Sequence, residues 1–201
     1  MLRIGLTGGI ATGKSYVLDQ FRRHGVPCLD ADELVHGVEA AGTEATTAIA
    51  ARFGREVLTP DGAVDRARLG PIVFADPVAR TDLEAIVHPA VYRAIVAGLR
   101  GFELLGGYPF AVVDVPLLYE TGAEQQFDRV IVTVCPEAMQ RARLAERGMS
   151  EEAARQRLAA QWPIEKKAQR ADFVIRTDGT FEETDRKVSE LVEILKSSGQ
   201  N

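Results

Sequence analysis

The chain has 201 residues, of which 46% are apolar and 26% are charged, a composition typical of a folded globular protein rather than a disordered one. The net charge of -5 argues against nonspecific nucleic-acid binding, and no apolar run approaches the roughly 18 residues of a membrane span. The first residues lead directly into an apolar strand pattern, which leaves no room for a cleavable signal, and the two cysteines stand apart in apolar stretches, as buried reduced thiols do. We therefore expect a cytoplasmic protein with no membrane association, no nucleic-acid partner and no obligate protein partner.

The N-terminal stretch carries a complete phosphate-binding pattern. An apolar strand over residues 2–6 leads into Gly-Gly-Ile-Ala-Thr-Gly-Lys-Ser at residues 8–15, and a helical pattern follows as far as Gly25. In a P-loop of this kind, backbone N–H groups surround the phosphates, Lys14 reaches the β- and γ-oxygens and Ser15 ligates Mg²⁺. The predicted nucleotide-binding residues are Gly8, Gly9, Ile10, Ala11, Thr12, Gly13, Lys14, Ser15 and Tyr16.

A second short strand, over residues 26–29, is followed by two aspartates at its carboxyl end, Asp30 and Asp32. In an open parallel sheet this is where ligands bind, so a carboxylate here is placed to accept a proton from an attacking hydroxyl. An aspartate at this point is also suited to cap the helix that begins near Glu33. The pair predicts one capping residue and one general base.

Residues 33–105 have a helical pattern that is interrupted by turns at Gly54, at residues 59–62 and at residues 76–77. We interpret this stretch as a helical insertion that closes over an acceptor substrate. Its candidate contacts are His36, Arg66, His88 and Pro89. The residue before a proline is biased away from the helical conformation, so a structural role for His88 at a helix end competes with a ligand contact.

Residues 109–118 are nearly all apolar, as expected for a central parallel strand that is buried on both faces. Asp114 is the only acid in this run. In a P-loop protein it is placed to hold Mg²⁺ or its water, and the alternative is an aspartate that caps the following turn. Glu120, six residues later, is a second candidate.

A fourth strand, over residues 129–135, precedes Pro136 at a helix start, and the segment 140–170 then carries eight cations against four glutamates. Gln140, Arg143 and Arg147 share one helix face, so both arginines point in a common direction. They form either a solvated face or a pair that stabilises charge on a transferring phosphoryl group. Because like charges repel, we expect the empty segment to be open and mobile, with few apolar residues to dock it, and to close over a triphosphate.

A fifth strand over residues 171–175 and a final helix, introduced by a capping box of Thr180 and Glu183, complete the pattern. Strands that alternate with helices predict an α/β fold with a five-stranded parallel sheet flanked by helices.

Taken in order, these motifs resemble the dephospho-CoA kinase family over nearly the whole chain. A P-loop alone is shared with many functions, so the specific features are His88-Pro89, the run Val-Pro-Leu-Leu-Tyr-Glu at residues 115–120, and Gln140 with Arg143 and Arg147. The other matching motifs are Asp30-Ala31-Asp32, Asp65-Arg66 with Leu69, Val73-Phe74, Phe127-Asp128, Ala159-Ala160-Gln161 and residues 171–175.

The resemblance implies a nucleoside-monophosphate-kinase-like P-loop fold in one domain. Its core would be residues 1–32, 106–139 and 171–201, with a CoA-binding insertion over 33–105 and a lid over 140–170. The implied reaction is ATP-dependent phosphorylation of the 3′-hydroxyl of dephospho-CoA, with Mg²⁺, to give coenzyme A and ADP. Asp32 would be the base, because the family motif places the acid second.

The implied site residues fall into three groups. The catalytic group is Asp32, Lys14, Arg143 and Arg147, the metal group is Ser15 and Asp114, and the acceptor group is Asp32, His36, Arg66, His88, Pro89, Leu117 and Glu120. The spacing from Pro136 to Gln140 is one residue longer than in the family, so either lid arginine could face the γ-phosphate.

Two other functions stay open on the residues alone. One is a different small-molecule P-loop kinase, whose acceptor is a nucleoside monophosphate or a sugar acid, and the acceptor motifs weigh against it. The other is a nonenzymatic nucleotide-dependent switch. A GTP-dependent switch would carry a base-reading Asn-Lys-x-Asp motif, which this sequence lacks.

Overall fold

The computed structural model describes residues 1–198, which form two compact units. The larger unit consists of residues 1–29 and the described residues from 101 onward, and the smaller unit consists of residues 30–100. Five strands form one sheet in the order β2-β3-β1-β4-β5. They are β1 (Leu2–Gly8), β2 (Cys28–Asp30), β3 (Phe110–Asp114), β4 (Arg129–Val134) and β5 (Phe173–Arg176). The parallel five-stranded sheet that the sequence predicts is confirmed.

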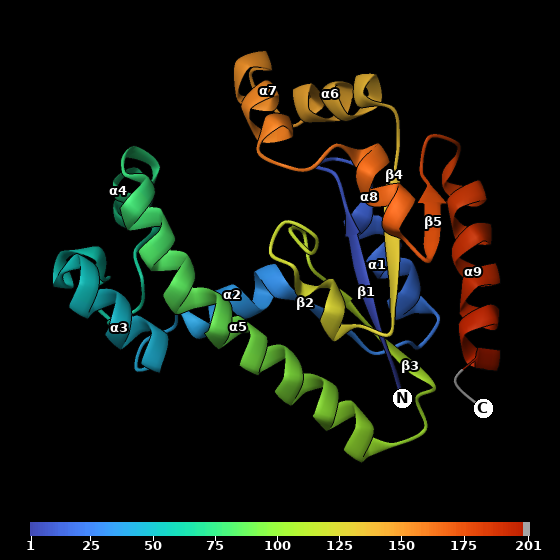
Figure 1. The fold of residues 1–201 in the computed structure, drawn as a ribbon, viewed down its shortest axis with the longest axis horizontal. Helices are drawn as coiled ribbons and strands as arrows, with labels where there is room; N and C mark the ends of the chain where they lie inside the picture. Colours follow the sequence, from blue (N-terminus) through green and yellow to red (C-terminus); the bar gives the residue numbers. More distant parts are fainter. Residues whose placement is uncertain (199–201) are drawn as a thin grey trace. The chain divides into compact units, whose positions relative to one another are not determined.

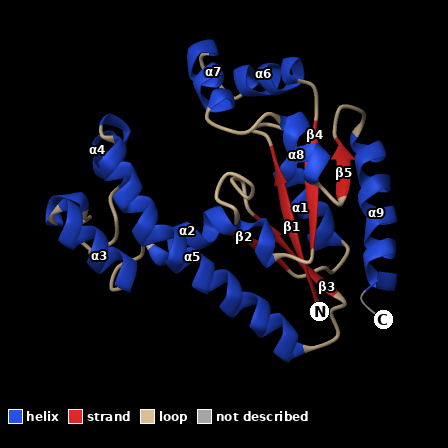
Figure 2. Cartoon of the chain, viewed as in Figure 1, coloured by secondary structure: helices blue, strands red, loops and turns tan. Residues whose placement is uncertain are grey.

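Helices cover both faces of this sheet, as the blue and red elements of Figure 2 show. On one face, α1 (Lys14–Arg23) and α9 (Phe181–Ser198) pack on β1 and β4 through an apolar cluster that includes Leu6, Phe21 and Ile131. On the other face, α8 (Ile164–Arg170) packs on β4 through a second cluster that includes Val132. The sheet is therefore buried on both sides, which is why its strands read as continuous apolar runs.

The predicted lid segment contains α6 (Glu137–Glu146) and α7 (Glu151–Ala159) and lies in the larger unit. Leu144 of α6 and Ala154 of α7 are buried against each other and against Ala11 of the P-loop. A small apolar cluster therefore joins this segment to the P-loop, whereas the sequence led us to expect few apolar docking residues.

The smaller unit is helical, as predicted. It contains α2 (Ala31–Val38), α3 (Glu44–Phe53), the short 3-10 helix η1 (Arg55–Val57), α4 (Arg66–Ala75) and most of α5 (Pro77–Leu105), whose colours run from blue at α2 through teal to green in Figure 1. Side chains cap three of these helices: Asp30 caps α2, Thr43 caps α3 and Asp65 caps α4. Its buried residues include Ile49, Val57, Leu69 and Ile95.

The predicted third strand is too long, and of the two roles considered for His88 the one at a helix end is not found. The third strand ends at Asp114 rather than at residue 118, and a series of turns follows, because Pro116 has no N–H with which to continue a strand ladder. Helix α5 runs through His88 and Pro89 without ending. A proline inside a helix removes a hydrogen bond to the carbonyl four residues earlier, here that of Ala85. Ala85 and Pro89 are both exposed, so water can satisfy that carbonyl.

None of the helices in residues 1–198 is both long enough and apolar enough to span a membrane.

Candidate active site

The P-loop joins the carboxyl end of β1 to α1, and its carbonyl groups are held from outside by side chains. Five successive carbonyls, those of Gly8, Gly9, Ile10, Ala11 and Thr12, each accept a hydrogen bond from a side chain. The donors are, in the same order, Lys167, Thr12, Gln140, Arg143 and Thr177. Because the carbonyls are engaged outward, the loop can present its N–H groups on its inner side, which is the arrangement that binds anions.

Two glycines make this conformation possible. A Cβ atom on Gly8 would lie 2.9 Å from the backbone carbonyl oxygen of Thr133 on the neighbouring strand β4, so glycine allows that close approach. Gly13 has a φ of 82° directly before α1, a conformation that other residues rarely adopt. No side chain caps α1. Its first backbone hydrogen bond runs from the Val17 amide to the Gly13 carbonyl, so the three amides before Val17 have no helical carbonyl to pair with. These amides and the positive end of the helix are suited to phosphate.

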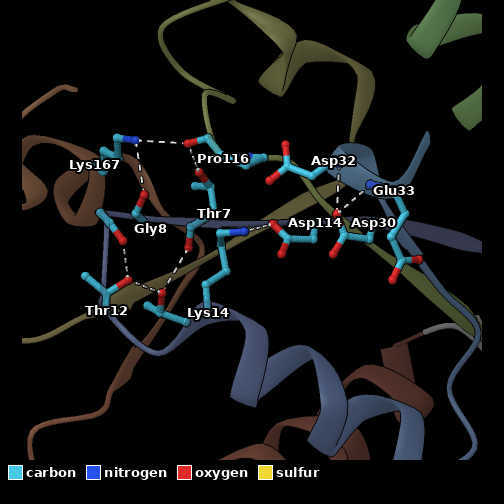
Figure 3. A network of polar contacts seen from close by, with 12 residues as sticks. Thr7, Gly8, Thr12, Lys14, Asp30, Asp32, Glu33, Asp114, Pro116 and Lys167 are labelled. Atoms are coloured by element: carbon cyan, nitrogen blue, oxygen red, sulfur yellow. Dashed lines mark hydrogen bonds and ion pairs between the residues drawn. The ribbon is translucent and has the colours of Figure 1, made fainter. Parts of the chain in front are cut away.

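Lys14 and Asp114 form an ion pair at the carboxyl ends of β1 and β3 (Figure 3). Asp114 is only 1% exposed. Leu6, at the end of β1, lies directly opposite Asp114 in the sheet register, so the strand pairing itself brings this carboxylate to the P-loop. Asp114 therefore does not act only as a turn cap.

Ser15 and Asp114 are the two predicted metal ligands. The Ser15 side chain is exposed at the start of α1, and the carboxylate of Asp114 lies beside Lys14. Mg²⁺ prefers oxygen ligands, keeps several waters and is commonly held by one or two protein oxygens together with substrate phosphates. This pair of oxygen donors beside an anion-binding loop fits that pattern.

The predicted helix face of Gln140, Arg143 and Arg147 contacts the P-loop through only two of these three side chains. Gln140 donates to the Ile10 carbonyl at 2.6 Å, and Arg143 donates to the carbonyls of Ala11 at 3.1 Å and Thr177 at 2.7 Å. Arg147 lies just beyond the end of α6, and its exposed side chain makes no hydrogen bond or ion pair with residues 1–198. Two residues of this helix face, Gln140 and Arg143, therefore bind the P-loop carbonyls, and the Arg147 side chain remains free.

Glu120 lies beneath the P-loop, in the turns that follow β3. Its Oε1 atom forms an ion pair of 2.8 Å with Lys167 and accepts a hydrogen bond of 2.9 Å from the Trp162 amide. Leu117, in the same turns, is exposed. Of these two predicted acceptor contacts, Leu117 presents an exposed side chain, whereas Glu120 is already engaged with Trp162 and with Lys167 of α8.

The Tyr16 side chain points to α9, where its hydroxyl donates to Asp185 at 2.6 Å and its ring contacts Phe181. The hydrogen bond to Asp185 raises the pKa of the phenol. Tyr16 can therefore offer a nucleotide its backbone amide, because its side chain is bound to α9.

The two cysteines are unreactive thiols. Burial raises the pKa of the Cys135 thiol beside Arg143, and burial raises the pKa of Cys28 to about 12.

In the smaller unit, the structure separates the two aspartates by role. Asp30 is the N-cap of α2 and accepts hydrogen bonds from the amides of Asp32 and Glu33. The Asp32 side chain is exposed in the first turn of α2, and it forms no hydrogen bond or ion pair within the described part of the chain. The capping role predicted for one of the pair therefore falls to Asp30, which leaves the Asp32 carboxylate free.

Asp32, His36 and Arg66 lie on one chain of hydrogen bonds. His36 Nδ1 lies 2.7 Å from the Asp32 carbonyl, and Arg66 Nη1 lies 2.9 Å from His36 Nε2. Arginine can only donate, so Nε2 accepts and the neutral His36 ring carries its proton on Nδ1. Arg66 also pairs with Glu39 at 2.6 Å.

His88 and Pro89 are exposed on α5, and neither side chain has a hydrogen bond to any residue in 1–198.

Sequence reasoning missed the positions of Lys167 and Thr177 and gave no role to Gln161, whose Oε1 accepts the Ile10 amide at 2.8 Å. A signal existed for Lys167. Ile164, Ala168 and Ala171 repeat at helical spacing and pack on the sheet, and Lys167 stands on that apolar face. Because Lys167 was grouped with the surface cations of the segment 140–170, its burial was not predicted.

Comparison with known proteins identifies the family. The dephospho-CoA kinase family model matches residues 2–183. A dephospho-CoA kinase from Anaeromyxobacter dehalogenans is 48% identical over 96% of this chain and 92% of its own length. The solved structure of a dephospho-CoA kinase from Campylobacter jejuni is 26% identical, with a TM-score of 0.74 over 98% of both chains.

Shikimate kinase from Acinetobacter baumannii shares the fold at 15% identity, with a TM-score of 0.53 over 98% of this chain and 94% of its own. The P-loop kinase fold is thus common to enzymes with different acceptors, and the family match distinguishes among them. The chain belongs to the dephospho-CoA kinase family.

Proposed function

We propose that this protein transfers the γ-phosphoryl group of ATP to the ribose 3′-hydroxyl of dephospho-CoA, which gives coenzyme A and ADP. The observation that carries this proposal is a P-loop with five outward-held carbonyls in a chain that matches the family over residues 2–183. In the reaction the 3′-oxygen bonds to the γ-phosphorus, the bond from that phosphorus to the bridging oxygen of ADP breaks, and the hydroxyl proton leaves to a base.

In this proposal, the phosphates lie against the amides of residues 8–16, which include the uncapped first turn of α1. Lys14 exchanges its contact with Asp114 for the β- and γ-oxygens, since a flexible ammonium can turn between two nearby anions. Ser15 and Asp114 would hold Mg²⁺, which supplies charge neutralisation on the phosphates when bound. Asp114 thus serves as the resting partner of Lys14 and as a metal-side carboxylate.

Asp32 is the proposed base. Asp30 already receives two backbone amides as the α2 cap, whereas the Asp32 carboxylate is exposed and has no partner among residues 1–198. A base must be free to accept the substrate's proton. His36 and Arg66, joined to Asp32 by the hydrogen-bond chain, are proposed acceptor contacts in the same unit, as are His88 and Pro89. Leu117 is the proposed acceptor contact in the larger unit.

The lid arginines take different proposed roles. Arg143 holds the Ala11 and Thr177 carbonyls, and we assign it to the shape of the nucleotide site. Arg147, which has all its donors free, is assigned to charge on the transferring phosphoryl group, because a planar guanidinium can donate two hydrogen bonds to phosphate oxygens.

A coupled assay of ADP release tests the proposal. We expect turnover with ATP and dephospho-CoA, no turnover when Mg²⁺ is chelated, and at most slight turnover when nucleoside monophosphates, gluconate or shikimate replace dephospho-CoA at equal concentration. Faster turnover with one of these acceptors would assign the protein to another small-molecule kinase activity. Slow hydrolysis that no acceptor accelerates would favour a nucleotide-dependent switch.

The cytoplasm is the proposed compartment. Cys28 and Cys135 are both free thiols, which suits a reducing environment. Coenzyme A precursors and ATP would be the small-molecule partners there.

A further inference from the structure

We propose that Lys167 is a positioning residue for phosphoryl transfer, which fixes the first peptide of the P-loop relative to the strand that carries Asp114. The inference rests on the proposed placement of the ATP phosphates in residues 8–16. It concerns a residue outside the P-loop, at the far end of the predicted lid segment.

Lys167 is completely buried, which is unusual for a lysine. Its Nζ atom lies 2.8 Å from Glu120 Oε1 and 3.3 Å from each of the carbonyl oxygens of Gly8 and Pro116. An ammonium group has three N–H donors, so these three acceptors use all of them. The cation is therefore fully satisfied in a dry site, and its geometry is fixed from three directions.

The acceptors belong to the two strand ends that define the phosphate site. Gly8 is the first residue of the P-loop, and Pro116 stands two residues beyond Asp114. The Pro116 carbonyl also accepts the Thr7 hydroxyl at 3.1 Å. Figure 3 shows Lys167 reaching the Gly8 and Pro116 carbonyls, with the Lys14–Asp114 pair in the same network. One ammonium thus joins the end of β1 to the end of β3.

The docking of α8 does not by itself require this charge. Ile164, Ala168 and Ala171 of that segment already pack on the sheet with Trp162. A buried ion pair can often be replaced by apolar side chains without loss of stability. Both carbonyl acceptors of Lys167 lie at the phosphate site. We therefore attribute the buried position of this lysine to its role in orienting the Gly8 peptide. With that carbonyl held outward, it cannot turn toward the phosphates and repel them.

The experiment compares ATP affinity, steady-state kinetics and thermal unfolding of the full chain with those of four variants. They are Lys167→Met, the double variant Lys167→Met with Glu120→Gln, Lys166→Met and Lys14→Ala. The double variant is included because Lys167→Met alone leaves a buried carboxylate without its cation, a change large enough to prevent folding. Lys166→Met is the matched control, since it removes the same charge from an exposed neighbour that lies over the Trp162 ring.

We expect Lys167→Met and the double variant to bind a nonhydrolysable ATP analogue about tenfold more weakly, a loss of the size that one hydrogen bond to a charged group provides. The KM for dephospho-CoA should stay within about twofold, because the Lys167 hydrogen bonds to the Gly8 and Pro116 carbonyls lie at the phosphate site. The double variant should also regain much of the unfolding temperature that Lys167→Met loses, and amide exchange of residues 7–15 should be faster in both. Lys166→Met should match the parent.

Recovery of both unfolding temperature and ATP affinity in the double variant would reduce Lys167 to a structural residue and overturn the inference. An equal loss of affinity in Lys166→Met would overturn it as well, by attributing the effect to net charge. Lys14→Ala separates this inference from the proposed function. Weak binding in Lys14→Ala with normal binding in the double variant refutes only the role of Lys167. Normal binding in Lys14→Ala would refute the placement of the phosphates.

Discussion

Charged side chains are arranged differently in the two units. In the larger unit, Lys14 pairs with buried Asp114 and buried Lys167 pairs with Glu120, and both lysines contact groups beside the P-loop. In the smaller unit, the hydrogen-bond chain of Asp32, His36 and Arg66 is exposed. Breaking a buried pair by removing one partner costs about 3–5 kcal/mol, whereas an exposed pair contributes about 0–1 kcal/mol.

This difference separates two kinds of mutational effect. Substitutions at the P-loop of the larger unit should change activity and stability together. Substitutions in the exposed chain of the smaller unit should change kinetics with a smaller effect on unfolding. The following predictions test that separation, beginning with the largest expected effect.

Lys14→Ala should lower kcat/KM by about 10⁴-fold, because it removes a cation from the developing phosphoryl charge. It should also lower the unfolding free energy, since it takes the cation partner from buried Asp114, while the far-UV circular dichroism spectrum stays native. Adding Asp114→Asn should restore part of the stability and none of the activity. Loss of the folded spectrum in Lys14→Ala would mean that the lysine is chiefly structural.

Asp32→Asn should lower kcat about a thousandfold, within the range for loss of a general base, and should leave ATP affinity and unfolding temperature near the parent values. Asp30→Asn is the matched control. Asparagine caps helices about as well as aspartate, so this variant should be nearly normal in stability and turnover. If Asp30→Asn proved the more damaging change to turnover, the roles within the pair would be reversed.

Arg147→Lys should lower kcat about tenfold with unchanged ATP affinity, because a lysine keeps the charge and loses the two-donor geometry toward a phosphate. Arg143→Lys should instead weaken ATP binding, since the guanidinium bonds to Ala11 and Thr177 are removed. Stopped-flow turnover and nucleotide titration measure the two effects. Full activity of Arg147→Lys would return Arg147 to the solvated-face interpretation, and unchanged ATP affinity in Arg143→Lys would refute the assignment of Arg143 to the nucleotide site.

Arg66→Gln should raise the KM for dephospho-CoA about fivefold, as expected for loss of one charged contact. The Arg66 side chain is exposed but its partner Glu39 is buried, so the unfolding temperature should fall, though less than in Lys14→Ala. Arg68→Gln, also on α4 and paired with Asp65, is the control and should leave KM unchanged. A drop in unfolding temperature for Arg66→Gln as large as that of Lys14→Ala would show that the exposed chain is structural and would remove the contrast between the units.

The smallest effect should appear in hydrogen exchange of the predicted lid. Most of its eight cations have local partners; Arg155, for example, pairs with Glu152, and Arg170 pairs with Glu124. The side chains of Arg147 and Arg157 have no hydrogen bond or ion pair within residues 1–198. A nonhydrolysable ATP analogue should therefore protect residues 147–160 slightly more, with less change over 161–170 and in α1. Uniform protection with and without the analogue would argue against closure.

Local sequence patterns predicted much of the fold and of the nucleotide site. The P-loop could be recognised because glycine, lysine and serine are needed at fixed spacing within a single turn. The capping box of Thr180 and Glu183 formed as expected, and the helical insertion was recognisable from its periodicity. Each of these features depends on residues close together in the sequence. His88-Pro89 is the exception, since α5 continues through it.

The parallel sheet, the P-loop and the family motifs could be predicted from the residues alone, because they depend on local spacing and apolar periodicity. Which charged groups are buried depends on how the chain packs. Lys167 lies 159 residues from Gly8, and no local pattern reports that its ammonium meets that carbonyl. Likewise, only the strand register places Asp114 beside Lys14, and only the capping geometry distinguishes Asp30 from Asp32. A charge is satisfied by whatever the fold brings within about 3 Å of it, and that is a property of packing rather than of neighbouring sequence.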